Sequence, residues 1–234
     1  MDNLAKPGPF NLQRYSVMLS CGLITKVVLI TSRAEVYGRE NFTFQPGTLI
    51  IGNHQSMIDS FLVGTALYLP KAWKLKYFNS LPYHAAAQEN FFKNYFLKWL
   101  CTNCNCLPVK PGRNSPDILY KISELLKNGK TVFVFPEGGR TRDPNGEFRP
   151  AAAAIGQLIY RVKCPVVPVS IWGANHLLPI GSHVPHFGQK LKIAIGRPVN
   201  FGELLKQKYS AKLAQQIIDT GMLEVKKIFV ELSK

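Results

Sequence analysis

Acidic residues are scarce in this chain: its 234 residues include 14 Asp and Glu against 29 Lys and Arg, which gives a net charge of +15. A chain so short of negative charge is expected to bind polyanions: nucleic acid, an anionic membrane surface, or phosphorylated and acidic carriers. RNA-recognition, zinc-finger and helix-turn-helix signatures are missing from the sequence, so its motifs do not support nucleic acid. A hydrophobic content of 46% excludes a disordered or fibrous chain and predicts a globular domain.

The cysteines do not form the pattern of a disulfide framework. They number five, with Cys101, Cys104 and Cys106 crowded together and Cys21 and Cys164 isolated. Cys101 and Cys104 have the spacing of half a zinc site, but no second Cys pair or His pair follows them, so the sequence predicts no metal. We therefore expect reduced thiols in a protein that faces the cytosol.

The sequence also has no apolar run of the roughly 20 residues that a membrane span needs, and no signal cleavage site. Residues 15–31 form its most apolar early stretch, which is 17 residues long and contains Lys26. One interpretation is a buried core helix. The other is a helix that lies in one leaflet of a membrane, with Arg14, Lys26 and Arg33 at the depth of the headgroups.

From residue 48 onward, short apolar runs alternate with amphipathic stretches. Strands are expected at 48–51, 131–135, 166–171 and 192–195, and helices at 56–69, 117–128, 151–162 and 201–232. This alternation predicts an α/β fold with a largely parallel central sheet flanked by helices. No internal repeat or linker divides the chain.

Two unusual loops follow two of these strands, where open α/β sheets collect their chemistry. The first, residues 52–59, carries His54, the side chain best suited to accept a proton near neutral pH, and Asp59, which could hold one histidine tautomer. Five residues is a poor spacing on a regular helix, but at a strand-to-helix turn His54 can fold back over Asp59. The alternative is that His54 caps the end of the strand and Asp59 is a solvated residue of the helix. We interpret Ser56 as a helix cap, not as a nucleophile.

The second loop follows the strand at 131–135 and has the composition of an anion site. Gly138 and Gly139 allow backbone N–H groups to approach a ligand, and Arg140 offers forked donors that match phosphate oxygens. Glu137 could orient an arginine or accept a hydrogen bond from a substrate hydroxyl. The alternative is a surface turn with solvated charges.

Together the two loops resemble a known family. Residues 53–59 (NHQSMID) resemble the His-x4-Asp motif of the glycerolipid acyltransferases, 135–140 (FPEGGR) their Phe-Pro-Glu-Gly-x-Arg block, and 166–171 (VVPVSI) a late strand. The resemblance covers roughly residues 35–200. It implies an α/β acyltransferase domain at 35–234 preceded by a membrane-associated helical segment at 1–34.

The resemblance also implies an activity: transfer of an acyl group from acyl-CoA or acyl carrier protein to a lysolipid hydroxyl, at the cytoplasmic face of the cell membrane, by a peripheral or monotopic protein. His54, held by Asp59, would act as general base without any cofactor. Glu137, Gly138, Gly139 and Arg140 would bind the substrate.

One block departs from the family pattern. Asn105 stands where glycine is usual and Pro111 where a phosphate-binding arginine is usual. Lys110 or Arg113 could supply the missing charge. The resemblance makes 1-acylglycerol 3-phosphate the leading acceptor, and the departure at Asn105 and Pro111 keeps lyso-ornithine lipid, another lysophospholipid and glycerol 3-phosphate as alternatives. A non-catalytic basic module that docks on membrane or nucleic acid is the alternative to an enzyme.

Residues 71–100 interleave aromatic residues with lysines. This composition suits a bilayer interface, and it would also suit stacking on nucleic acid. Phe92, Phe96 and Trp99 have helical spacing and could instead face the core. We expect a mixture, with one side on the core and the other on the membrane.

Overall fold

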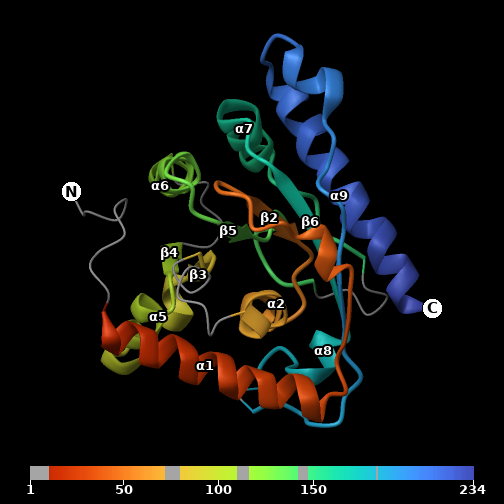
Figure 1. Cartoon of the computed structure of the whole chain (residues 1–234). Helices are drawn as coiled ribbons and strands as arrows, with labels where there is room; N and C mark the ends of the chain where they lie inside the picture. Colours follow the sequence, from red (N-terminus) through yellow and green to blue (C-terminus); the bar gives the residue numbers. More distant parts are fainter. Residues whose placement is uncertain (1–10, 72–79, 110–115, 142–146, 183) are drawn as a thin grey trace.

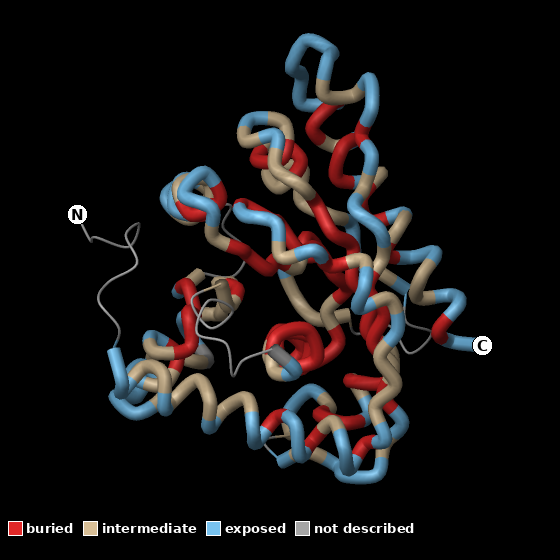
Figure 2. Tube along the Cα trace, in the orientation of Figure 1, coloured by how far each residue is buried: buried red, intermediate tan, exposed pale blue. Residues whose placement is uncertain are grey.

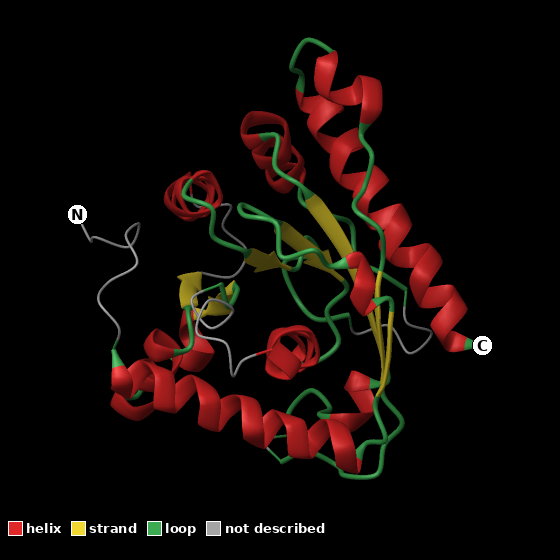
Figure 3. Cartoon of the chain, viewed as in Figure 1, coloured by secondary structure: helices red, strands yellow, loops and turns green. Residues whose placement is uncertain are grey.

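The computed structural model describes residues 11–71, 80–109, 116–141, 147–182 and 184–234, which form one seven-stranded sheet with helices on both faces (Figures 1 and 3). The strands lie in the order β1-β7-β6-β2-β5-β3-β4, and neighbours pair in parallel except β6 with β7. The strand bounds are β1 Glu35–Tyr37, β2 Leu49–Gly52, β3 Tyr83–Ala87, β4 Cys106–Val109, β5 Val132–Val134, β6 Val166–Trp172 and β7 Lys192–Ile195. The predicted α/β class with a largely parallel sheet is confirmed.

The helices of the described residues cover both sheet faces. Their bounds are α1 Leu12–Thr31, α2 Asp59–Tyr68, α4 Gln88–Phe91, α5 Tyr95–Asn103, α6 Pro116–Lys127, α7 Ala153–Val162, α8 Ala174–Leu177 and α9 Ala211–Ser233. Short 3₁₀ turns occupy Arg39–Asn41, Leu69–Lys71 and Gly202–Lys206.

The alternation of side chains along the strands explains the layers. Leu49 and Ile51 of β2 belong to one buried cluster with residues of α6, α7 and α9, whereas Ile50 belongs to a second cluster with residues of α2. Successive strand residues point to opposite faces, so a parallel strand covered on both sides must be apolar throughout. Figure 2 shows the result, with the central strands and α2 buried.

Several element bounds differ from the sequence prediction. The predicted helix over 201–232 is divided, because Ser210 caps α9 by accepting a hydrogen bond from the N–H of Leu213 at 3.1 Å. The helix expected from residue 56 begins at Asp59. Strands β1, β3 and β4 were not predicted. β3 reads Tyr-His-Ala-Ala-Ala and contains no β-branched residue, so it lacks the composition by which strands are recognised.

Helix α1 is longer than the apolar run on which it was predicted. It begins at Leu12, where Asn11 caps it, and its 20 residues correspond to about 30 Å. Among the described residues it is the one helix long and apolar enough to cross a membrane, and little of it is buried. One side of α1 packs against α2 and α5 (Figure 1). Leu23, Ile24 and Val27 on another side are exposed. The division of the chain at residue 34 stays a prediction.

In the segment 71–100, some aromatic side chains pack into the protein as predicted. Residues 72–79 lie outside the described part. Phe91 and Phe92 pack against a cluster of Cys101, Cys104 and Cys106. By contrast Tyr95, Phe96 and Trp99 of α5 are exposed, so the interpretation that places Phe96 and Trp99 in the core is wrong. All five cysteines are free.

Candidate active site

The two loops meet because their strands are neighbours. β2 and β5 pair in parallel, so the loops that follow them leave the sheet at the same edge. Two hydrogen bonds join the loops at His54: its N–H donates to Oε1 of Glu137 at 2.9 Å, and its carbonyl accepts from the N–H of Thr141 at 2.7 Å. The second loop therefore fixes the main chain of His54 on both sides.

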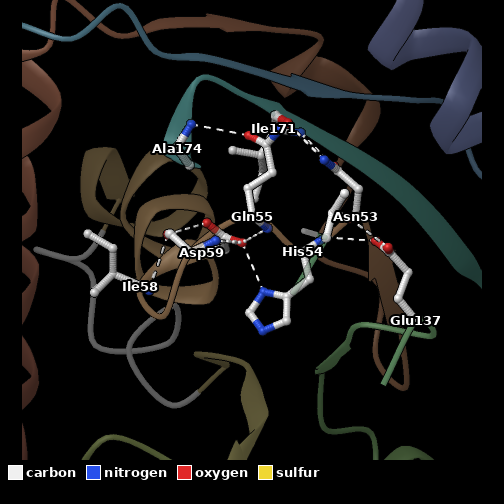
Figure 4. A network of polar contacts seen from close by, with 10 residues as sticks. Asn53, His54, Gln55, Ile58, Asp59, Glu137, Ile171 and Ala174 are labelled. Atoms are coloured by element: carbon white, nitrogen blue, oxygen red, sulfur yellow. Dashed lines mark hydrogen bonds and ion pairs between the residues drawn. The ribbon is translucent and has the colours of Figure 1, made fainter. Parts of the chain in front are cut away.

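His54 and Asp59 are in direct contact (Figure 4). His54 Nδ1 lies 2.9 Å from Asp59 Oδ2, and Asp59 has no exposed side-chain surface. The contact is possible because residues 53–58 are not helical, so the chain folds back over the first turn of α2. A carboxylate only accepts hydrogen bonds, hence Nδ1 carries a proton, and in the neutral form of the ring the free lone pair is on Nε2.

The Asp59 carboxylate is held by the loop that precedes it. Its Oδ2 also accepts from the N–H groups of Gln55 at 2.6 Å and Ser56 at 2.8 Å, and its Oδ1 accepts from the Ser56 hydroxyl. Asp59 is the first residue of α2, where the helix dipole favours a negative charge. Ser56 is thus not the helix cap that we expected, because α2 starts three residues later and the hydroxyl donates to Asp59.

The residues beside His54 anchor the loop to strand β6 and its end. The Asn53 amide exchanges two hydrogen bonds of 2.8 Å with the main chain of Ile171, and Gln55 Oε1 accepts from the N–H of Ala174 at 3.1 Å (Figure 4). Both amide side chains are buried. The sequence analysis assigned them no contribution; two amides flanking a histidine after a buried strand were the only available signal.

The imidazole of His54 stacks on Phe135, with ring centroids 4.0 Å apart and an interplanar angle of 10°. This stacking sets the ring plane, and 19% of the His54 side chain stays exposed. His54 borders an open pocket of about 530 Å³, which Met57, Ala87 and Arg140 also line. The imidazole can therefore meet a ligand in that pocket.

Glu137 makes its contacts inside the protein. Besides the bond from His54, its Oε2 accepts from the Thr141 hydroxyl at 2.8 Å and from the N–H of Arg149 at 2.9 Å. Among the described residues the Glu137 carboxylate accepts from no arginine side chain, and Glu137 does not line the pocket of His54. Its assignment to substrate binding stays a prediction. The carboxylate joins the loops and positions His54.

The two glycines let the second loop turn. Gly138 has a φ of 65°, which glycine adopts without strain, and its N–H donates to the Phe135 carbonyl at 3.1 Å. A side chain at Gly139 would collide with the guanidinium of Arg149. Arg149 is thus a further cation beside the loop that the sequence analysis missed, since it lies outside the motif.

Arg140 lines the same pocket as His54. Its Nη1 is buried and has no hydrogen-bond partner among the described residues. Of the predicted substrate-binding residues, Lys110 and Arg113 lie outside the described part of the chain. His54, Asp59, Glu137, Gly138, Gly139 and Arg140 are brought together at one edge of the sheet.

The departure at Asn105 has a structural explanation. Asn105 has a φ of 60°, in the left-handed region that asparagine tolerates better than most residues other than glycine. Its side chain accepts a hydrogen bond from Arg14 of α1 and donates to the Leu81 carbonyl at 3.1 Å. Asparagine therefore suits the left-handed backbone at this position, which a glycine would also adopt without strain.

A second pocket, of about 610 Å³, adjoins the first. It lies between α1 and α2 and is lined mostly by apolar side chains such as Met18, Leu19 and Leu69. Ser60, Phe61 and His84 border both pockets. The site thus joins a pocket that holds the polar side chains of His54 and Arg140 to a second pocket that is almost entirely apolar.

Comparison with known proteins gives one family. The family model described as Acyltransferase matches residues 33–172. The chain is 26% identical to a chloroplastic 1-acyl-sn-glycerol-3-phosphate acyltransferase, BAT2, of Brassica napus over 79% of its own length, but it spans only 51% of that relative. It is 26% identical to the 1-acyl-sn-glycerol-3-phosphate acyltransferase of Bacillus subtilis, covering 77% of this chain and 81% of the relative.

Among solved structures, the 1-acyl-sn-glycerophosphate acyltransferase PlsC of Thermotoga maritima has a similar fold. The TM-score is 0.62, and the match covers 92% of this chain and 80% of that one. With an identity of 24%, this similarity establishes the fold alone.

Proposed function

The chain belongs to the acyltransferase family, and we propose that it transfers an acyl group from an acyl thioester to the hydroxyl of a lysolipid, with 1-acylglycerol 3-phosphate as the leading acceptor. The observation that carries this proposal is the His54–Asp59 pair at the border of a pocket that Arg140 also lines. The names of the relatives support the acceptor.

In the proposed reaction, His54 Nε2 takes the proton of the acceptor hydroxyl as the oxygen attacks the thioester carbonyl. The new C–O bond forms, the C–S bond breaks, and the proton passes from His54 to the leaving thiolate. Asp59 stabilises the imidazolium that exists in between, and no acyl-enzyme is needed. General-base help of this kind contributes ~10²–10⁴ in rate, and the rest comes from positioning the two substrates.

The unpartnered Nη1 of Arg140 supports an anionic acceptor. A guanidinium with one buried, spare donor favours a group that can accept from it, and phosphate oxygens match this geometry. We keep Lys110 and Arg113 as further candidates for binding the headgroup. Lyso-ornithine lipid, another lysophospholipid and glycerol 3-phosphate are the acceptors to compare, and acyl-CoA and acyl carrier protein the donors.

We further propose that the protein sits on the cytoplasmic face of the membrane as a monotopic protein. The exposed apolar residues of α1 and the exposed aromatic residues of α5 support this placement. The net charge of +15 supports contact with an anionic leaflet, where each basic residue contributes about 1 kcal/mol.

The test is incorporation of labelled acyl groups into lysophosphatidate by the purified protein and by His54→Ala. The expected loss is at least ~10²-fold, because the general base is removed. His186→Ala is a matched control, since this exposed histidine lies away from the pockets. Equal transfer by wild type and His54→Ala would refute the mechanism, and no transfer to any acceptor would favour the non-catalytic docking module.

A further inference from the structure

We infer that His84 accepts a hydrogen bond from a hydroxyl of the bound substrate and so makes the enzyme prefer substrates that carry this hydroxyl. The inference rests on the proposed acyl transfer. It adds a specificity-determining residue outside the two loops that carry the family motifs.

His84 stands at the junction of the two pockets. It belongs to β3, where it pairs with Phe133 of β5 and Cys106 of β4, and it borders both the pocket of His54 and the apolar pocket. Only 7% of the residue is exposed. The ring therefore lies where the linings of the two pockets meet, together with Ser60 and Phe61.

The hydrogen bond that the His84 ring makes to the main chain determines its tautomer. Nε2 lies 2.8 Å from the carbonyl oxygen of Cys104, and a carbonyl can only accept, so Nε2 carries the proton. Nδ1 is then an acceptor with a free lone pair. It is buried and has no hydrogen-bond partner among the described residues.

Burial keeps this acceptor available. Loss of solvation lowers the pKa of His84 to about 4, so the ring stays neutral in the cytoplasmic pH range. The ring of Phe61, with its centroid 5.1 Å away, covers part of it without offering a donor. The lone pair at Nδ1 therefore lacks any described donor until a ligand supplies one.

Four buried side-chain polar atoms lack a partner in the described residues, and two of them, Arg140 Nη1 and His84 Nδ1, belong to residues that line the pocket of His54. Arg140 supplies a donor and His84 an acceptor. A buried acceptor that stays unpaired is costly, so a ligand that satisfies it is favoured over an analogue that lacks the hydroxyl. We expect a preference of roughly tenfold, which is typical of one such hydrogen bond.

Two parts of the substrates could carry the hydroxyl: the acyl chain of the donor, or the polar part of the acceptor. The donor arm of the test compares a 3-hydroxyacyl-CoA with an unsubstituted acyl-CoA of equal length. The acceptor arm compares glycerol 3-phosphate, which has an additional free hydroxyl, with 1-acylglycerol 3-phosphate. Each arm is measured as kcat/KM and as the rise in Tm when the ligand alone is added.

Two variants separate the two nitrogens of the ring. His84→Gln can keep an N–H near the Nε2 position but loses the acceptor, whereas His84→Asn can place its amide oxygen near Nδ1. The inference expects the hydroxyl preference to disappear in His84→Gln and to persist in His84→Asn. The Tm of each variant without ligand shows whether it is folded.

A preference in the donor arm identifies the acyl chain as the source, and one in the acceptor arm the headgroup. Equal kcat/KM and equal Tm shifts within both arms for the wild type would overturn the inference, and so would a preference that His84→Gln retains. Absence of all acyl transfer would instead refute the proposed function, while the Tm comparison would still decide the binding preference.

Discussion

The N–H of His54 donates to the carboxylate of Glu137 at 2.9 Å, although 83 positions separate the two residues. The same carboxylate accepts from the N–H of Arg149, so it joins three parts of the chain at the edge of the sheet. Glu137 is almost fully buried, hence water does not compete strongly for these bonds. The position of the proposed general base thus depends on an acid that does not touch the reacting atoms.

Glu137→Gln is expected to lower kcat about 10- to 100-fold and to leave the acceptor KM nearly unchanged. The amide has one acceptor oxygen in place of two, so one of the three hydrogen bonds is lost, at a cost of about 1–3 kcal/mol in stability. Steady-state kinetics and urea denaturation measure the two effects. Glu203→Gln, at an exposed acid, is the control. A rise in KM with normal kcat would indicate that Glu137 binds substrate instead.

Arg140→Lys is expected to raise the acceptor KM, because lysine keeps the charge but loses the forked guanidinium that matches phosphate. Arg161→Lys, on the exposed side of α7, should behave like the wild type. If Arg140 acts only in the transition state, kcat will fall at constant KM. Normal kinetics for Arg140→Ala would show that Arg140 does not bind the acceptor.

Asn105→Gly is expected to be tolerated better than Asn105→Ala. Both substitutions remove the side-chain bonds to Arg14 and Leu81, but only glycine adopts the positive φ without strain. The difference in the free energy of unfolding should be about 1 kcal/mol in favour of glycine. Chemical denaturation measures it, and equal stabilities would contradict the backbone explanation.

Acid should weaken the fold through His84. Its folded pKa of about 4 lies below the unfolded value of about 6.5, so below pH 6.5 the unfolded chain binds a proton that the folded chain does not. The contribution of the neutral, buried His84 to stability is fully present above pH 6.5. It is lost as the pH falls toward 4, which lowers the free energy of unfolding by about 3 kcal/mol. Denaturation curves at several pH values for wild type and His84→Gln give the contribution by difference. Parallel pH profiles would contradict the buried neutral histidine.

Replacement of Leu23, Ile24 and Val27 by serine is expected to weaken the salt-resistant part of vesicle binding. These side chains form an exposed apolar side of α1, whose burial in a bilayer does not depend on salt. The part due to basic residues should remain at low salt and disappear at high salt. Co-sedimentation with anionic vesicles measures both parts. Serine at Leu223 and Val230, exposed on α9, is the control, and equal losses would argue against a specific membrane side on α1.

The sequence alone predicted those strands whose residue composition matches their buried position. β2 and β6 are covered on both faces and consist largely of β-branched and aliphatic residues, so both were predicted. β3 was missed because its alanines carry no strand preference, and its place in the sheet follows from pairing with β5. Strand pairing is a long-range property that one stretch of sequence does not encode.

The contacts of the candidate site show the same difference between local and long-range features. The proximity of His54 and Asp59 could be expected, because a turn of five residues is a local feature. The contacts of Glu137 and Asn53 with residues 83 and 118 positions away required the assembled sheet. The unpartnered Nδ1 of His84 could also not be predicted from the sequence, because whether a polar atom finds a hydrogen-bond partner depends on all its neighbours in the fold.

The bond between Arg14 and Asn105 has a consequence for the order of events during synthesis. The two residues are 91 positions apart, which corresponds to roughly 5–20 s of translation. In that interval α1 has already been synthesised, whereas α5 and Asn105, which it contacts in the folded protein, have not. On the proposed membrane placement, a bilayer is the apolar surface open to this helix in that interval, and we expect α1 to meet the membrane before the sheet is completed.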